Sequence, residues 1–123
     1  MIQLNKKARL IKHNNLDWNK NLPGHVKCYS RTLVGPENVG SELFDFHISK
    51  CLPGGVVKEH SHQKVEHVYW GHEGSGIVTA ENKDYKLEPE VAIYIPAGCK
   101  HKIVNNTSKD LYYLVVNVPA NDM

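Results

Sequence analysis

Clusters of glycine, proline and asparagine cut this chain into segments too short for long helices. They stand at residues 21–26, 34–41, 51–55, 72–76, 87–90, 95–98 and 104–110. The apolar runs between them, such as ELFDFHI (42–48), GIVTA (76–80) and LYYLVVNV (111–118), are rich in the β-branched and aromatic residues that strands favour. No run keeps the 3.6-residue period of a sustained amphipathic helix. Short strands separated by frequent turns predict an all-β sandwich or barrel.

The length of the chain sets the scale of that fold. It has 123 residues, of which 41% are hydrophobic and 23% charged, as in an ordinary globular protein with one core. We expect a single domain in which residues 1–40 supply N-terminal strands or an arm, 41–119 form the barrel core, and 120–123 form a tail. ENKD (81–84) has the turn residues of a hairpin between GIVTA and the YKL that follows.

The distribution of charge argues against nucleic acid as a partner, and the distribution of apolar residues argues against a membrane. The net charge is only +2, and the basic residues are spread along the chain, with arginine only at Arg9 and Arg31. Phosphate binding needs a clustered basic face, so we expect no nucleic acid partner. No apolar stretch is long enough to span a bilayer, and the N-terminus lacks the apolar region of a secretory signal, so we expect no membrane partner.

The three cysteines, Cys28, Cys51 and Cys99, are widely spaced and form no C-x-x-C pair. Neither structural zinc nor a redox motif is therefore indicated. We interpret them as free thiols in a reducing cytoplasm, with Cys99 as a small buried hydrophobe near His101.

The stretch KEHSHQKVEH (58–67) concentrates three histidines in ten residues. His60 and His62 are two residues apart, so on a strand their side chains share one face and start roughly 7 Å apart, close enough to converge on one ion. Neutral imidazole is a common ligand of first-row divalent metals. An H-x-H pair alone is also typical of an exposed polar strand end, so its context has to decide.

That context resembles the two motifs of the cupin superfamily. The first motif is matched by GGVVKEHSHQKVEHVYWGHEG (54–74), and the second by EVAIYIPAGCKHKIVN (90–105), although Glu90 stands where the family has glycine. We expect Pro89 to shape that turn instead. The resemblance implies a cupin β-barrel, also described as a double-stranded β-helix or jelly roll. It also implies a divalent transition metal held by His60, His62, His101 and one further ligand.

Two neighbouring residues compete for the fourth ligand position. Glu66 and His67 follow His62 at the two spacings that the family allows, but counting six residues back from Gly74 reaches His67. We therefore favour His67, which gives a four-histidine site similar to that of some small cupins. Strand parity leaves the choice open, since both faces carry plausible pocket residues. Four neutral ligands would leave the ion its full charge, whereas a glutamate would favour harder metals. The expected ion is one of Fe, Mn, Zn, Ni and Cu, all of which histidine sites accept.

Other polar and aromatic residues are interpreted as follows. Tyr69 and Tyr94 are expected to be core or pocket-wall residues and are also our candidates for proton transfer. Asn105 is expected to bond a turn. The remaining histidines, His13, His25, His47 and His72, are interpreted as surface residues, with a barrel mouth as the alternative for His47.

The resemblance implies a function only in outline, because cupins include many enzymes and binding proteins. Our leading hypothesis is a metal-dependent enzyme that acts on a small organic molecule, with a preference for a dioxygenase-type oxidoreductase. A lyase, isomerase or cyclase, with the metal as Lewis acid and Tyr69 or Tyr94 as acid and base, is the nearest alternative. A non-catalytic ligand-binding or sensing module is the third. We expect a cytoplasmic homodimer, with 5–12 as a candidate exchanged strand.

Overall fold

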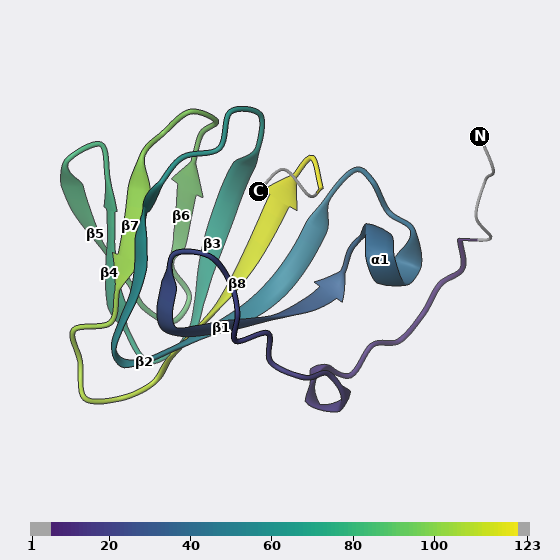
Figure 1. The fold of residues 1–123 in the computed structure, drawn as a ribbon, viewed down its shortest axis with the longest axis horizontal. Helices are drawn as coiled ribbons and strands as arrows, with labels where there is room; N and C mark the ends of the chain where they lie inside the picture. Colours follow the sequence, from purple (N-terminus) through teal and green to yellow (C-terminus); the bar gives the residue numbers. More distant parts are fainter. Residues whose placement is uncertain (1–5, 121–123) are drawn as a thin grey trace.

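Within residues 6–120, which the computed structural model describes, eight antiparallel strands curl into a nearly closed barrel (Figure 1). The all-β prediction is thereby confirmed. The elements are η1 His13–Asn15, β1 His25–Val34, α1 Pro36–Val39, β2 Asp45–His60, β3 Glu66–Glu73, β4 Gly76–Ala80, β5 Lys83–Leu87, β6 Ala92–Ile95, β7 His101–Val104 and β8 Leu111–Val118. Residues 6–12 form an exposed arm without strand pairing, and the exchange of this segment between two chains stays a prediction.

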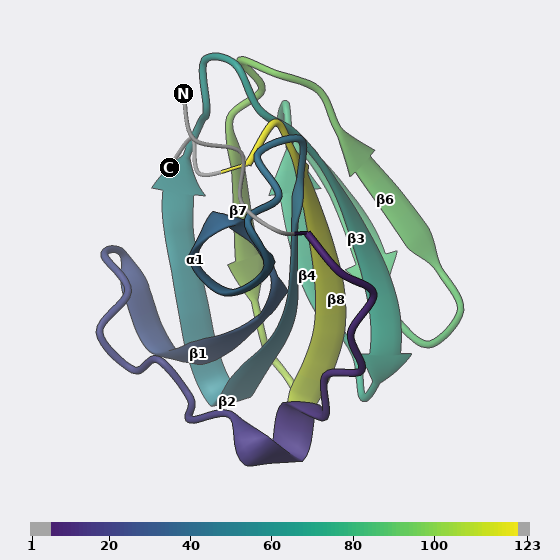
Figure 2. The same ribbon diagram turned by 90° about the vertical axis from the view of Figure 1, so that its right-hand side faces the viewer.

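The long strand β2 organises the sheet. The strand order is β5-β4-β7-β2-β8-β3-β6, with β1 paired to β2 outside this path. The N-terminal part of β2 pairs with β8 and its C-terminal part with β7, so β2 belongs to both walls of the barrel. Figure 2 shows β8 and β3 side by side, with β6 beyond β3. The edge strands β5 and β6 come into contact, which nearly closes the barrel.

Alternating side chains of the strands fill the interior. Along β8, Leu111, Tyr113, Val115 and Asn117 are buried while their neighbours are half-buried or exposed. This is the two-residue period of a strand with one face toward the core. The core cluster also draws on every other strand, through residues that include Cys51, Val57, Tyr69, Val78, Leu87, Ile95, Ile103 and the β1 residue Cys28.

Two tight turns depend on left-handed backbone conformations. Glu81 and Asn82 connect β4 to β5 with φ of 50° and 65°, as a two-residue hairpin turn requires. The hairpin predicted at ENKD is therefore present. Glu90 adopts φ of 68°, so it keeps the left-handed conformation that glycine provides most easily. The expectation that Pro89 alone shapes this turn was incomplete, because Glu90 itself carries the unusual conformation.

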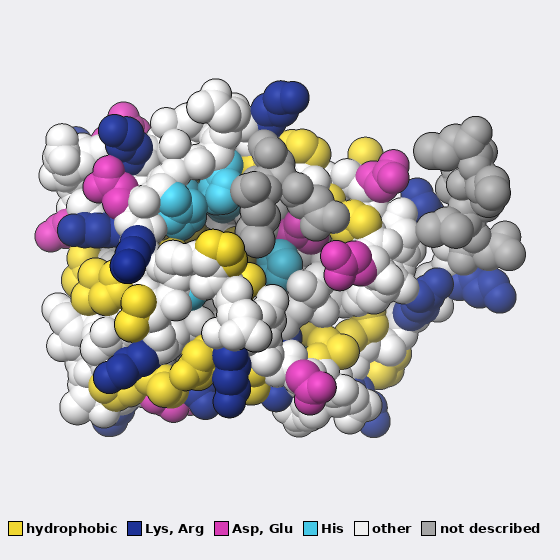
Figure 3. All heavy atoms as spheres, viewed as in Figure 1, with side chains coloured by type: hydrophobic (Ala, Val, Ile, Leu, Met, Phe, Trp, Pro, Cys, Tyr) yellow, Lys and Arg dark blue, Asp and Glu magenta, His cyan; other side chains and the backbone are white. Residues whose placement is uncertain are grey.

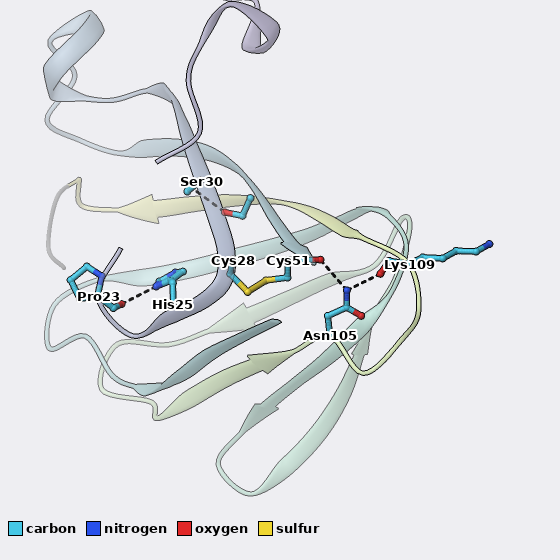
Figure 4. Close-up of a disulfide and its surroundings, with 8 residues drawn as sticks. Pro23, His25, Cys28, Ser30, Cys51, Asn105 and Lys109 are labelled. Atoms are coloured by element: carbon cyan, nitrogen blue, oxygen red, sulfur yellow. Dashed lines mark hydrogen bonds between the residues drawn. A yellow bond between two sulfur atoms is a disulfide. The ribbon is translucent and has the colours of Figure 1, made fainter. Parts of the chain in front are cut away.

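The cysteines correct one prediction. Cys28 on β1 and Cys51 on β2 are directly paired in the antiparallel register, and their Cα atoms are 4.1 Å apart and joined by a disulfide (Figure 4). The free-thiol interpretation is wrong for these two residues, because it considered spacing along the chain and not strand register. Among the described residues only Cys99 is a free, buried thiol, so cysteine usage no longer supports the expectation of a reducing compartment.

Two further features of the fold bear on earlier interpretations. Asn105 is fully buried, and its side-chain amide donates hydrogen bonds to the carbonyls of Cys51 and Lys109, as the expected structural role requires (Figure 4). Within residues 6–120, no helix is long and apolar enough to cross a membrane.

Candidate metal centre

Four histidines from three strands and one loop meet near one end of the barrel. His60 ends β2, His62 lies in the loop that follows, His67 is on β3 and His101 begins β7. His60 and His101 are direct partners in the β2–β7 register, and their ring centroids are 4.3 Å apart. Histidine side chains gather on the face shown in Figure 3. The spacing read from the sequence thus corresponds to a cluster in space.

The distances within this cluster suit a shared ion. One ring nitrogen from each of His60, His62 and His101 lies within 4.8 Å of the other two. The His67 ring lies beside this trio, with its centroid 4.7 Å from that of His62 and 5.2 Å from that of His101. The structure therefore brings together all four histidines that the sequence singled out, three as a close set and His67 against them.

Hydrogen bonds set which ring nitrogen faces the cluster. The Nδ1 of His60 bonds the Lys58 carbonyl at 2.7 Å, and the Nδ1 of His101 bonds the Cys99 carbonyl at 2.9 Å. A carbonyl oxygen can only accept, so each Nδ1 carries a proton, and in the neutral ring Nε2 keeps its lone pair. This is the usual outer-sphere support of a metal-binding histidine.

Two ring nitrogens of the cluster have no hydrogen-bond partner among the described residues. The Nε2 atoms of His67 and His101 are buried and make no hydrogen bond with the described residues. The two residues are only 5% and 1% exposed. A buried polar atom without a hydrogen bond costs about 1–3 kcal/mol of folding free energy, so native proteins rarely keep one without a specific reason. A bound divalent transition metal would be such a reason, because neutral imidazole nitrogens are its preferred donors.

Burial keeps two of the clustered histidines neutral. Burial lowers the pKa of His67 to about 4, an effect that the hydrogen bond to Asn117 opposes and the neighbouring imidazoles reinforce. Burial likewise lowers the pKa of His101 to about 4, opposed by the bond to the Cys99 carbonyl. Both side chains are therefore neutral at pH 7, which is the form that binds a metal.

The alternative ligand, Glu66, points the other way. Residues along β3 alternate between exposed and buried, with Glu66 and Val68 outside and His67 and Tyr69 inside. The Glu66 carboxylate accepts a hydrogen bond from the Tyr94 hydroxyl at 3.3 Å. Tyr94 is itself 57% exposed, so the structure places neither residue at the cluster. Of the two tyrosines considered for proton transfer, only Tyr69 adjoins the histidines.

Tyr69 is part of the wall behind the cluster. Its ring stacks on His67 at a centroid distance of 5.8 Å and an interplanar angle of 23°, and meets Tyr113 edge to face at 5.6 Å. Burial, with contributions from Tyr113 and Cys99, raises its pKa well above 10. Tyr69 is therefore a neutral phenol at pH 7, able to donate a hydrogen bond but not to act as a tyrosinate.

A small cavity lies near Cys99, and none of the four histidines lines it. Its volume is about 230 Å³, and its lining includes Ala80, Glu81 and Cys99. Ala80 is the register partner of His101 on β4, and the Cys99 carbonyl bonds the His101 ring. These two residues connect the cavity to the centre, while the rest of its lining includes the exposed Tyr85 and Tyr94.

The sequence reading missed the polar residues behind His67. Its Nδ1 bonds the Asn117 amide oxygen, and Asn117 in turn donates to Asp45 at 2.6 Å. Asn117 lies in the apolar run 111–118, and Asp45 lies on the polar face of 42–48. A polar residue at a core-facing position of a strand was the available signal. His47, interpreted as a surface residue, is part-buried and bonded to Asp45, which corresponds to the alternative of a barrel mouth.

Comparisons with known proteins agree with this picture. The family model of the Cupin domain matches residues 47–117. The dimethylsulfoniopropionate lyase DddW of Ruegeria pomeroyi is 34% identical over 82 residues, which cover 67% of this chain and 53% of that protein. The tetracenomycin polyketide synthase protein TcmJ of Streptomyces glaucescens is 33% identical over 85 residues, which cover 68% of this chain and 56% of that protein. The chain thus spans about half the length of these curated relatives.

A solved structure extends the likeness of the fold. The polyketide cyclase RemF of Streptomyces resistomycificus superimposes with a TM-score of 0.82 at 23% identity, over 91% of this chain and 80% of that one. At this level of identity the superposition is a statement about architecture.

Proposed function

This chain belongs to the cupin superfamily, and from that premise we propose that it is a metal-dependent enzyme acting on a small organic anion. The observation that carries the proposal is the pair of buried, unpartnered Nε2 atoms of His67 and His101, next to the rings of His60 and His62. We propose these four residues as the ligands. A bound divalent ion would polarise a carbonyl or carboxylate oxygen of the substrate as a Lewis acid.

The ligand set bears on the charge of the substrate. All four proposed ligands are neutral imidazoles, whereas Glu66 lies outside the barrel. Such a site keeps the full positive charge of its ion in a partly buried environment, where electrostatic attraction is stronger than in water. A carboxylate or an enolate satisfies that charge better than a neutral molecule does.

The reaction that we propose is a lyase or cyclase reaction that passes through an enolate-like oxyanion. Support comes from two relatives, one named as a lyase and one as a polyketide synthase protein. The proposed role of Tyr69 is to donate a hydrogen bond from its phenol to that oxyanion, since burial keeps it protonated and it adjoins His67. Apolar neighbours such as Ile93 and Val115 would exclude water from the developing charge.

A dioxygenase-type reaction is the second candidate. The same neutral histidine set favours it, because a four-imidazole site leaves coordination positions for a small neutral ligand such as dioxygen. The two candidates differ in one measurable quantity, the uptake of oxygen. A non-catalytic binding module would show neither turnover nor uptake.

To test this proposal, the purified protein is loaded in separate samples with Fe²⁺, Mn²⁺, Zn²⁺, Ni²⁺ and Cu²⁺. Each form is then offered carboxylates with a β-leaving group and enolisable aromatic ketones, while products are followed by NMR and oxygen by an electrode. We expect turnover without oxygen uptake for at least one metal. Tyr69→Phe should lower kcat by about 10²–10⁴-fold. Tyr112→Phe, on the outer face of β8, is the matched control and should retain the rate.

Two outcomes would contradict this proposal. Oxygen uptake in step with product formation would make the protein an oxygenase. Saturable binding of a substrate analogue without turnover, with every metal, would make it a binding module.

A further inference from the structure

A chain of hydrogen-bonded side chains runs from the histidine cluster into the barrel wall. His67 bonds Asn117, Asn117 bonds Asp45 at 2.6 Å, and His47 bonds the same Asp45 oxygen at 2.5 Å. The Thr32 hydroxyl closes the chain on the far side, 3.1 Å from the Nδ1 of His47. This chain lies outside the proposed ligand set, and neither motif of the family contains its Asn117 or Asp45.

Strand register places the three central members at one level. Asn117 on β8 is the direct partner of His67 on β3 and of Asp45 on β2. His67, Asn117 and Asp45 are 5%, 7% and 2% exposed. Directly opposed residues on neighbouring strands have Cβ atoms about 4.5–5.5 Å apart, so short polar side chains can meet there. The arrangement is therefore built into the sheet and does not depend on a mobile loop.

The chemistry of the three groups gives the chain a direction. The side-chain amide of Asn117 donates its N–H to the Asp45 carboxyl oxygen, which fixes the orientation of the amide. The amide oxygen of Asn117 then faces His67, and it can only accept. The Nδ1 of His67 must therefore carry a proton. In a neutral imidazole with a protonated Nδ1, Nε2 keeps its lone pair.

We propose that Asn117 and Asp45 are positioning residues that hold His67 as its Nδ1–H tautomer, with the Nε2 lone pair directed at the metal. The proposal rests on the proposed function in one respect, that a metal is what the Nε2 atom receives. His60 and His101 have their Nδ1 protons held by backbone carbonyls. His67 differs, because its Nδ1 proton is accepted by the side chain of Asn117. A substitution at position 117 can therefore remove the acceptor and test the proposal.

The first test reads the tautomer directly in the metal-free protein. Long-range ¹H–¹⁵N NMR spectra distinguish a protonated Nδ1 from a protonated Nε2 in a histidine ring. We expect the Nδ1–H form for His67 in the wild type at pH 7. Asn117→Leu removes the acceptor and should shift His67 toward the Nε2–H form. Asp45→Asn removes the carboxylate that fixes the orientation of the Asn117 amide. The amide can then rotate by half a turn, so His67 should be a mixture of the Nδ1–H and Nε2–H forms.

The second test measures Co²⁺ affinity by competition with a chromophoric chelator. Removing an outer-sphere partner typically costs about 10–100-fold in metal affinity, and we expect that loss for Asn117→Leu. The double variant Asp45→Asn with Asn117→Asp exchanges the two groups. The carboxylate at position 117 then accepts the Nδ1 proton of His67, and it also accepts the amide N–H from position 45. This variant should restore the Nδ1–H tautomer and bring the affinity to within about 3-fold of the wild type.

Ser49→Ala is the matched control. Ser49 is a buried polar residue of β2. Its hydroxyl donates to Ser30 and also bonds Tyr113, and neither partner is a member of the hydrogen-bonded series from His67 to Thr32. It should change neither the tautomer nor the affinity. Near-UV circular dichroism checks that each variant is folded, and the exchanged double variant decides the matter if Asn117→Leu does not fold.

The positioning role is overturned if His67 in the wild type carries its proton on Nε2. It is also overturned if folded Asn117→Leu keeps both the Nδ1–H tautomer and wild-type affinity, or if the folded exchange variant fails to restore the tautomer. A wild type that has the Nδ1–H tautomer but binds no Co²⁺ would instead refute the proposed function and leave the positioning role standing.

Discussion

Without metal, the protein should lose stability steeply as the solution is acidified. His67 and His101 carry pKa values lowered to about 4, first of all because they are buried, whereas an unfolded histidine titrates near 6.5. Between those values the unfolded chain binds a proton at each position and the folded chain does not. The free energy of unfolding is therefore highest above pH 6.5 and declines as the pH falls. The contribution of these two histidines is fully lost below about pH 4.

The size of the effect follows from the same two pKa values. A fall from 6.5 to about 4 corresponds to about 3 kcal/mol at each histidine. The free energy of unfolding should change by about 1.4 kcal/mol per pH unit for each such proton, and by about 2.7 kcal/mol where both contribute. Since domains have a total stability of about 5–15 kcal/mol, this loss is large enough to unfold a marginal protein.

Urea unfolding in the presence of a chelator, between pH 7.5 and pH 4.5, measures this slope before most carboxylates titrate. His101→Gln should halve the slope, because one of the two protons is removed. His72→Gln, at an exposed position of β3, should retain the full wild-type slope. A free energy of unfolding that stays constant across this range would refute the reasoning, as would an equal slope in wild type and His101→Gln.

Three further predictions concern the barrel itself. Glu90→Gly should stabilise the protein by about 1 kcal/mol in thermal or urea unfolding, because residue 90 adopts φ of 68°; a loss of stability would show that the glutamate side chain matters more than its backbone. Gly71→Ala should abolish folding or cost several kcal/mol, on the order of the largest single-residue effects, because an added Cβ would lie 1.8 Å from the Glu88 carbonyl oxygen. A soluble variant with wild-type circular dichroism would contradict this. Reduction of the Cys28–Cys51 disulfide, which spans 23 residues, should lower the free energy of unfolding by about 3 kcal/mol; identical urea curves with and without reductant would count against a formed disulfide.

Local features of the fold were predictable because they depend on residues close together in sequence. The turn at 81–82 and the strands at 76–80 and 111–118 are set by neighbouring residues, and the structure has them where they were expected. The histidine cluster was also within reach, because fixed spacings from Gly54 and Gly74 define the motif. Counting residues along a strand, odd against even, also shows which side chains share one face.

Parity does not say which face is inside, and that limit accounts for what was missed. His67 and Glu66 were both admissible until pairing with β6 and β8 turned His67 inward. Asp45 was assigned no role from the sequence, yet its side chain is buried opposite Asn117. The Cys28–Cys51 pair likewise depends on the register between two strands, which is decided by contacts distant along the chain.

The central claim, a metal centre made by four histidines, is tested most directly by metal content. The wild type, His67→Ala and Glu66→Ala are each saturated with metal, passed over a desalting column and measured by elemental analysis. The account predicts stoichiometric metal in the wild type and in Glu66→Ala, and strongly reduced retention in His67→Ala. A wild type that retains no ion, or a His67→Ala protein that keeps its metal while Glu66→Ala loses it, would contradict the account.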